Sequence, residues 1–310
     1  MLYKTLMLIS RIIRLLPYDV LLFLGKIFGQ LYYLLIKKQR ERAVAQMIPA
    51  LNVSESEARK LVKASFVNLA RNMLDILYMP NLNEKNLSKY IEIDHLERMR
   101  TALLEGHGVV VLTGHIGTWE WLSAAFSLNG MPVTAIAKLQ PNAEYSRVLD
   151  DLRATIHVEI FNRGTNELRA AGRALKDGKI LGFLADQDAG SGGAFINFLG
   201  KTASTPMGPA VFARRFNAPV LPAFIIRKED GRHLVKIGEI MHFEDTGDTD
   251  ADLLRFTEKM TKILEEVIRE NPTQWLWFQK RWNTPPEMQN KNKHHTVRAR
   301  RKSKTSEAEE

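Results

Sequence analysis

The chain has 310 residues, a formal net charge of +9 and no cysteine. With 45% apolar and 25% charged residues, its composition is that of a globular protein and excludes a disordered or fibrous one. The lack of cysteine excludes disulfides, thiolate metal sites and an acyl-cysteine intermediate. The positive charge favours nucleic acid, an anionic membrane or an acidic protein as partner, and charge alone does not choose among them.

The first segment of the chain, residues 1–38, predicts a membrane anchor. Its opening apolar run is interrupted on one side, within an arc of about 80° on a helix, by Lys4, Arg11 and Arg14. Pro17 ends that run, and the apolar stretch 20–36 follows, which is at the short end for a membrane span. We expect attachment to the cytoplasmic face of the inner membrane, with the basic residues against anionic headgroups. The alternative is a hairpin of two buried core helices.

A helical region is expected at 39–90. Ser54 and Glu57 have the spacing of a capping box, apolar residues then recur at helical intervals, and Pro80 ends the run.

Residues 91–286 have the pattern of an α/β core. Four short apolar runs rich in β-branched residues predict strands at 108–114, 132–137, 179–185 and 219–227. Helix candidates alternate with them at 118–128, 143–153, 166–177 and 206–216, and a last helix is expected at about 250–270. This alternation predicts a mainly parallel sheet flanked by helices. "QWLWFQKRW" (274–282) predicts a final strand or docking segment, and the polar tail 287–310 is expected to be disordered.

The stretch "LTGHIGTWEW" (112–121) carries the candidate chemistry. A buried strand would end at Thr113, and Gly114 and Gly117 would allow a tight turn that separates His115 from Glu120. In open α/β sheets ligands bind at this carboxyl edge. A carboxylate on one ring nitrogen fixes the histidine tautomer and makes the other nitrogen a better base for deprotonating a hydroxyl. A loop histidine followed by an ordinary helix-terminal glutamate remains the alternative at this point.

Three other motifs fail on their context. "FLGKT" (198–202) ends like a phosphate-binding loop, but Phe195 stands where that loop requires glycine. Ser191 in "AGSGG" lacks the strand directly before it and the helix directly after it that a nucleophile elbow needs. The histidines show no metal-ligand spacing, so no metal is expected.

A histidine and an acid separated by four residues resemble the HX4D/E signature of the glycerolipid acyltransferase superfamily. Glu120 in the acid position, "LKDGKILGFLADQDAG", "FINFLGKTASTPMGPAVFARR", "APVLPAFIIR" and the terminal "QWLWFQKRW" are similar to one branch, the lipid A biosynthesis lauroyl/myristoyl acyltransferases. The order and spacing of these segments over roughly residues 5–285 make the resemblance far more specific than the signature alone.

The resemblance implies roles for individual residues. His115 matches the catalytic base and Glu120 its orienting carboxylate. Substrate-binding or oxyanion roles are implied for Arg163, Asp186, Gln187 and Thr205. A substrate-binding or oxyanion role is also expected for Lys138, in "AKLQPN", where the sequence departs from the commoner family pattern, which leaves acceptor specificity open.

The expected function is transfer of an acyl chain from an acyl carrier protein or acyl-CoA thioester to a hydroxyl of a lipid A precursor. The expected enzyme needs no cofactor, binds anionic membrane lipid and does not bind nucleic acid, because the basic tail lacks interleaved aromatic residues. The alternatives are the same chemistry on a lysophospholipid, a phosphatidylinositol mannoside or an aminolipid. A serine hydrolase built on Ser191 and a non-enzymatic basic membrane-binding protein are alternatives of other classes.

Overall fold

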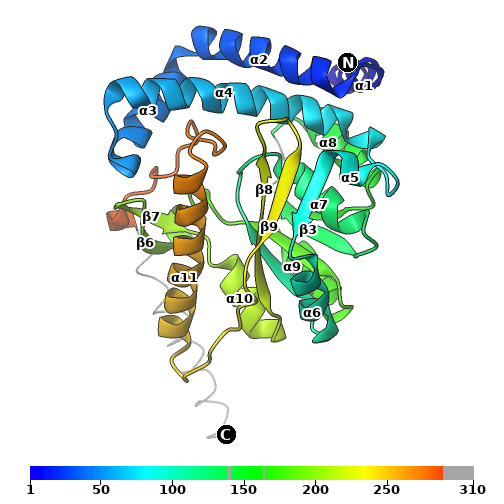
Figure 1. The fold of residues 1–310 in the computed structure, drawn as a ribbon. Coiled ribbons are helices and arrows are strands. Elements are labelled where there is room, and N and C mark those ends of the chain that lie inside the picture. Colours follow the sequence, from blue (N-terminus) through cyan, green and yellow to red (C-terminus); the bar gives the residue numbers. More distant parts are fainter. Residues whose placement is uncertain (138–140, 163–164, 289–310) are drawn as a thin grey trace, which may run out of the picture.

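A seven-stranded sheet of order β1–β9–β8–β2–β5–β3–β4 forms the centre of the computed structural model, which describes residues 1–137, 141–162 and 165–288 (Figure 1). The five strands from β8 to β4 run parallel, and β9 and β1 run opposite to them at one edge. The predicted α/β class with a mainly parallel sheet is therefore confirmed. The strands are β1 Ile91–Asp94, β2 Val109–Thr113, β3 Val133–Ala137, β4 Glu159–Asn162, β5 Ile180–Leu184, β8 Val220–Arg227 and β9 His233–Ile237.

The four strands expected from apolar runs all form, as β2, β3, β5 and β8. Every residue of β2 and β8 is buried, as expected for central strands covered on both faces. The sequence prediction missed β1, β4 and β9, which are shorter or more polar. It also missed a separate antiparallel hairpin, β6 Ala194–Phe198 with β7 Lys201–Thr205, which turns through Leu199 and Gly200, both with positive φ.

The helices expected in the core also form, as α7 Trp119–Ser127, α8 Ala143–Ala154, α9 Thr165–Lys176, α10 Gly208–Phe216 and α11 Thr249–Glu270. The sequence prediction missed α6 Leu96–Leu104. The N-terminal ones are α1 Leu2–Ile13, α2 Tyr18–Leu35, α3 Lys37–Leu51, α4 Glu55–Tyr78 and the single turn α5 Leu87–Tyr90. The Ser54 side chain caps α4 by accepting a hydrogen bond from the Glu57 amide at 3.2 Å, as the capping-box spacing predicts.

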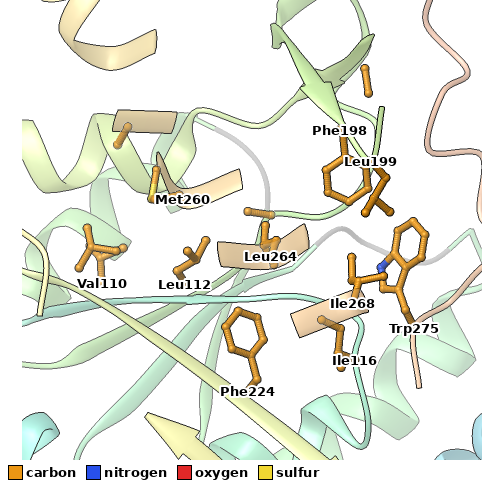
Figure 2. Packing of buried hydrophobic residues seen from close by; sticks show 14 of the residues in the cluster. Val110, Leu112, Ile116, Phe198, Leu199, Phe224, Met260, Leu264, Ile268 and Trp275 are labelled. Carbon is orange, nitrogen blue, oxygen red and sulfur yellow. The ribbon is translucent and has the colours of Figure 1, made fainter. Parts of the chain in front are cut away.

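The two faces of the sheet have separate apolar cores. Alternate residues of β2 point to opposite faces: Val110 and Leu112 pack with α9, α10 and α11, whereas Val109 and Val111 pack with α6, α7 and α8. Figure 2 shows Met260, Leu264 and Ile268, from successive turns of α11, within the first of these cores. The sheet is thus held between two helical layers, with its carboxyl edge left for loops.

The N-terminal helices α2 and α4 lie side by side at that edge (Figure 1). Their contact is close because Gly25 and Gly29 of α2 have no side chain: a Cβ at Gly29 would overlap the backbone of Val67, and one at Gly25 would overlap Arg71. The remaining face of α2 is uncovered, with Phe23 61% exposed. Within the described residues no single helix is long and apolar enough to cross a membrane. The bent pair α2 and α3, at 92°, passes such a test only when both are taken together, by length and composition.

A buried polar network joins α4 to the sheet. The Arg227 guanidinium at the end of β8 forms an ion pair with Asp75 of α4, and both side chains are almost fully buried. Tyr18 of α2 donates to Asp75 at 2.9 Å and accepts from Arg227 at 3.1 Å. His233 of β9 lies 3.1 Å from the Tyr18 hydroxyl, and burial lowers the pKa of His233 to about 3, so this ring stays neutral beside the arginine.

Replacing Asp75 by alanine should unfold the protein much more easily, because it leaves the Arg227 charge buried without a counter-ion. Loss of one partner of a buried pair typically costs about 3–5 kcal/mol. Urea denaturation followed by circular dichroism measures this difference. The matched control is Arg232→Ala, which removes the exposed pair with Asp230 and should change stability little. Equal stability losses in the two variants would contradict the structural role of the buried pair.

Candidate active site

The turn after β2 is shaped by its two glycines, as the sequence predicts. Gly117 has φ +57°, and a Cβ there would overlap the Ile225 carbonyl oxygen of β8. A Cβ at Gly114 would lie 3.2 Å from the Asp186 carboxyl carbon. The turn is also bonded to the terminal segment, since the Gly117 amide donates to the Gln274 carbonyl at 3.0 Å. His115 is therefore held in a compact turn against the end of the sheet.

The strand order brings a second loop to the same place. After β2, the next strand of the sheet is β3, which lies beyond β5. After β5, the next strand of the sheet is β8, which lies beyond β2. Because the two connections depart in opposite directions, the carboxyl ends of β2 and β5 form a switch point, which is where ligands bind in open α/β sheets. His115 follows β2 and Asp186 follows β5, so both lie at this switch point.

Asp186 is the carboxylate that contacts His115. Its Oδ1 lies 2.8 Å from Nδ1 of the ring, and its Oδ2 accepts a hydrogen bond from the His115 backbone amide at 3.0 Å. The Asp186 side chain is fully buried, whereas the His115 side chain is 18% exposed. One carboxylate thus fixes both the backbone and the ring of the histidine.

Asp186 is held in its ionised form. Burial alone would raise its pKa, but the charge and hydrogen bond of His115 and the donors around the carboxylate outweigh burial and hold the pKa of Asp186 below its usual value. An ionised carboxylate only accepts, so Nδ1 of His115 carries the hydrogen and donates it. In the neutral ring Nε2 is then the basic nitrogen.

Gln187 lies at that basic nitrogen. Its side-chain Nε2 is 3.2 Å from Nε2 of His115, and the residue is exposed. Because the ring nitrogen is the acceptor, the amide NH2 group of Gln187 faces it. The edge of the Trp119 ring lies against the imidazole, with ring centroids 5.1 Å apart. The arrangement presents a base toward solvent, covered by one exposed amide.

The predicted His115–Glu120 pair is wrong. Both carboxylate oxygens of Glu120 accept hydrogen bonds from Arg153 of α8, at 2.6 and 2.8 Å. Both ring nitrogens of His115 have the other partners described above. The physical reason is that Glu120 lies in the first turn of α7, where it faces α8, whereas the end of β5 is directly beside His115. Glu120 therefore braces α7 against α8.

The other predicted site residues fall in three groups. Asp186 and Gln187 do meet at His115, in contact with the base itself. Thr205 is buried, and its hydroxyl accepts from Arg281 at 2.7 Å, so its side chain has a structural partner. Lys138 and Arg163 lie outside the described residues, and their binding roles stay predictions. Among the residues described, no group of three or more His, Asp or Glu side chains is placed to hold a metal ion.

The terminal segment supplies contacts that sequence reasoning did not assign. Trp275 Nε1 donates to Asp186 Oδ2 at 2.8 Å, and Gln279 Nε2 lies 3.3 Å from the same oxygen. Trp275 also pairs with Ile116 in an isolated antiparallel bridge, and Figure 2 shows the two side by side. Segment 274–282, predicted as a strand or docking segment, forms turns that dock on the site. The one available signal was the density of tryptophan and glutamine in this short segment, because its neighbour Asp186 is 89 residues away in the sequence.

Replacing Glu120 by glutamine should lower the free energy of unfolding by about 1.5–3 kcal/mol, since a charged hydrogen-bonded partner of Arg153 is lost at a mostly buried position. Chemical denaturation measures it. The control is Asp150→Asn, because Asp150 also contacts Arg153, at 3.5 Å, but is half exposed. A Glu120→Gln protein no less stable than Asp150→Asn would contradict the bracing role.

Comparison with known proteins identifies the family of this chain. The family model described as bacterial lipid A biosynthesis acyltransferase matches residues 4–284. The lipid A biosynthesis palmitoleoyltransferase of Escherichia coli is 25% identical over 276 residues, 87% of each chain, and the lauroyltransferase of that species is 25% identical over 283 residues, 88% of each. The phosphatidylinositol mannoside acyltransferase of Mycolicibacterium smegmatis is 23% identical over 226 residues, 72% of each. The chain with a buried aspartate behind its histidine therefore belongs to the bacterial lipid A biosynthesis acyltransferases.

Proposed function

We propose that this acyltransferase moves a fatty acyl chain from a thioester, carried by acyl carrier protein or coenzyme A, to a hydroxyl of a lipid A precursor. The observation that carries the proposal is the His115–Asp186 pair at the switch point, with Nε2 of His115 directed outward. In this proposal Asp186, and not Glu120 as the family resemblance implies, orients the His115 ring.

The reaction needs one proton acceptor that later returns the proton. Nε2 of His115 takes the proton of the acceptor hydroxyl while that oxygen attacks the thioester carbonyl carbon. The tetrahedral intermediate then expels the thiolate, which receives the proton from the imidazolium. Asp186 stabilises the transient imidazolium charge, and the exposed amide of Gln187 gives way to the hydroxyl. General-base action of this kind contributes about 10²–10⁴ in rate.

The rest of the rate must come from positioning and from stabilising the oxyanion. The N-terminus of α10 is the candidate donor, because the first amide groups of a helix have no partner within it. Its first residue, Gly208, lies against Phe183, three residues before Asp186, and no side chain caps it. Backbone amides there would face an oxygen held near the base.

The acceptor is proposed from the relatives. Two of the relatives described above are named for lipid A biosynthesis and one for a phosphatidylinositol mannoside, so both kinds of glycolipid acceptor occur among them. Greater coverage and slightly higher identity favour a lipid A precursor. Lys138 and Arg163 are proposed to contact its phosphate groups. A lysophospholipid or an aminolipid is the remaining alternative with the same chemistry.

We propose that the N-terminal helices bind the cytoplasmic surface of the inner membrane. Large apolar side chains are exposed along α1 and α2, including Leu8, Ile12, Phe23, Phe28, Leu31 and Leu34. Lys4, Arg11 and Lys26 are exposed among them. An apolar face rimmed by cations is typical of a segment lying in an anionic membrane interface. Because α4 also contacts the turn of His115, membrane binding through α1 and α2 would bring His115 close to a lipid acceptor.

The chemistry is tested with purified variants, using lipid A precursor and an acyl thioester. His115→Ala should lose at least about 10²-fold in kcat, and Asp186→Asn should also lose activity, because the neutral amide no longer stabilises the imidazolium. Ser191→Ala is the control and should keep activity. Full activity of the His115→Ala variant would contradict the mechanism. Complete loss of activity in the Ser191→Ala variant would support a serine hydrolase. Mass spectrometry of lipids from cells lacking the protein should show lipid A short of one acyl chain.

Membrane attachment is tested by flotation with vesicles that contain anionic phospholipid. Phe28→Ser with Leu31→Ser should reduce the bound fraction at least about tenfold, because two apolar side chains no longer enter the interface. Leu104→Ser is the control: this residue is 87% exposed but ends α6, at the opposite end of the molecule from α2 (Figure 1). Equal losses for the two surfaces would contradict the proposal.

A further inference from the structure

A groove of about 590 Å³ separates α9 from α10 on the outer surface of the protein. Four cations line it: Arg169, Arg173 and Lys176 from α9 and Arg215 from α10. The first three recur at intervals of four and three residues, so they form one row along a helix face. All four are exposed. The groove is therefore a basic surface whose lining residues do not include His115, Asp186 or Gln187.

These charges are not neutralised within the described part of the chain. None of the four has a carboxylate within 4.0 Å there, whereas the neighbouring Arg214 forms an ion pair with Asp245 at 3.1 Å. Like charges held together in a row repel one another, and an opposite surface that docks on them relieves this repulsion. The row of cations on α9 is therefore available to bind an acidic partner.

The groove also has an apolar part. Leu168 and Val211 are 42% and 39% exposed, and the Phe216 ring lies against α9 because Gly172 has no side chain to displace it. Both exposed aliphatic residues lie in the N-terminal half of their helices, and α9 begins directly after β4, at the carboxyl edge of the sheet. The apolar end of the groove accordingly points toward the edge that holds His115, and the cations extend away from it.

We propose that this groove docks an acidic helical surface of a soluble protein that carries the acyl thioester. The inference rests on the proposed function and specifies its donor as a carrier protein. The row from Arg169 to Lys176 is about 10 Å long, which matches carboxylates spaced along a helix. From Gly172 to the start of α9 is also about 10 Å, so a flexible thioester arm would run past Leu168 and Val211 toward the base.

Other occupants fit these observations less well. One phosphate group is much shorter than the row. A nucleotide base finds no free ring to stack on, since the Arg215 guanidinium lies over Phe216 at 5.6 Å and the Phe216 edge meets Gly172. Helix α10, which lines one side of the groove, lies at the opposite end of the molecule from α1 and α2 (Figure 1). A bilayer in contact with those helices would not reach it.

The test compares two donors of the same acyl chain, dodecanoyl acyl carrier protein and dodecanoyl coenzyme A, with full-length enzyme. Arg169→Glu with Arg173→Glu should raise the KM for the carrier protein at least about tenfold, with a smaller difference at high salt. The rate with the coenzyme A donor should stay within about twofold, which also shows that the variant is folded. Arg169→Gln with Arg173→Gln, a milder change, should give a smaller effect in the same direction.

The matched control is Lys259→Glu with Lys262→Glu, which makes an equal change of charge on exposed positions of the neighbouring α11. It should leave the KM for the carrier protein unchanged. The docking proposal is overturned if the groove variant responds equally with both donors, if it loses binding to anionic vesicles instead, or if wild-type enzyme uses only the coenzyme A donor. Transfer from neither donor by the wild type would overturn the proposed function itself.

Discussion

The ion pair between Asp75 and Arg227 is the contact on which the geometry of the site depends. It joins α4 to the end of β8, and it also holds the turn of the base: the Thr118 hydroxyl donates to Asp75 at 2.7 Å and accepts from Arg227 at 3.0 Å. Asn72, one turn before Asp75, donates to the Gly117 carbonyl at 2.7 Å. The turn that contains His115 is therefore held by the buried Asp75–Arg227 pair on one side and by Asp186 on the other.

Such a pair is costly to bury, and here Tyr18, Thr118 and Asn72 supply hydrogen bonds to Asp75 and to the terminal nitrogens of Arg227, whereas Nε of Arg227 has no partner among the described residues. These partners come from α2, from the turn after β2 and from α4. Desolvation is thus offset only when the N-terminal helices and the sheet are assembled together. The same contacts that assemble the N-terminal helices also orient the turn of His115, so the helices proposed to bind the membrane and the proposed base are positioned together.

Sequence patterns predicted the central elements because buried strands and tight turns depend on residues that are neighbours in the sequence. The strands β2, β3, β5 and β8 and the turn at Gly114 and Gly117 follow from such patterns. Strand order does not, since it depends on which helices cover which face. Without that order the spacing of His115 and Glu120 along the chain suggested a pair, whereas the true neighbour, Asp186, is 71 residues away and becomes adjacent only through β2–β5 pairing. Arg153 was missed for the same reason.

At the switch point the connections after β2 and β5 run in opposite directions, and this affects which parts of the sequence can change independently. Strands β3 and β4 lie beyond β5 in the sheet, whereas the connection that contains the β6–β7 hairpin and α10 leads from β5 to β8, beyond β2. Because the two sides of the switch point are built by separate stretches of sequence, a substitution on one side need not disturb the other side or the His115–Asp186 contact between them. Each side can therefore change while the contact between the histidine and the aspartate is kept.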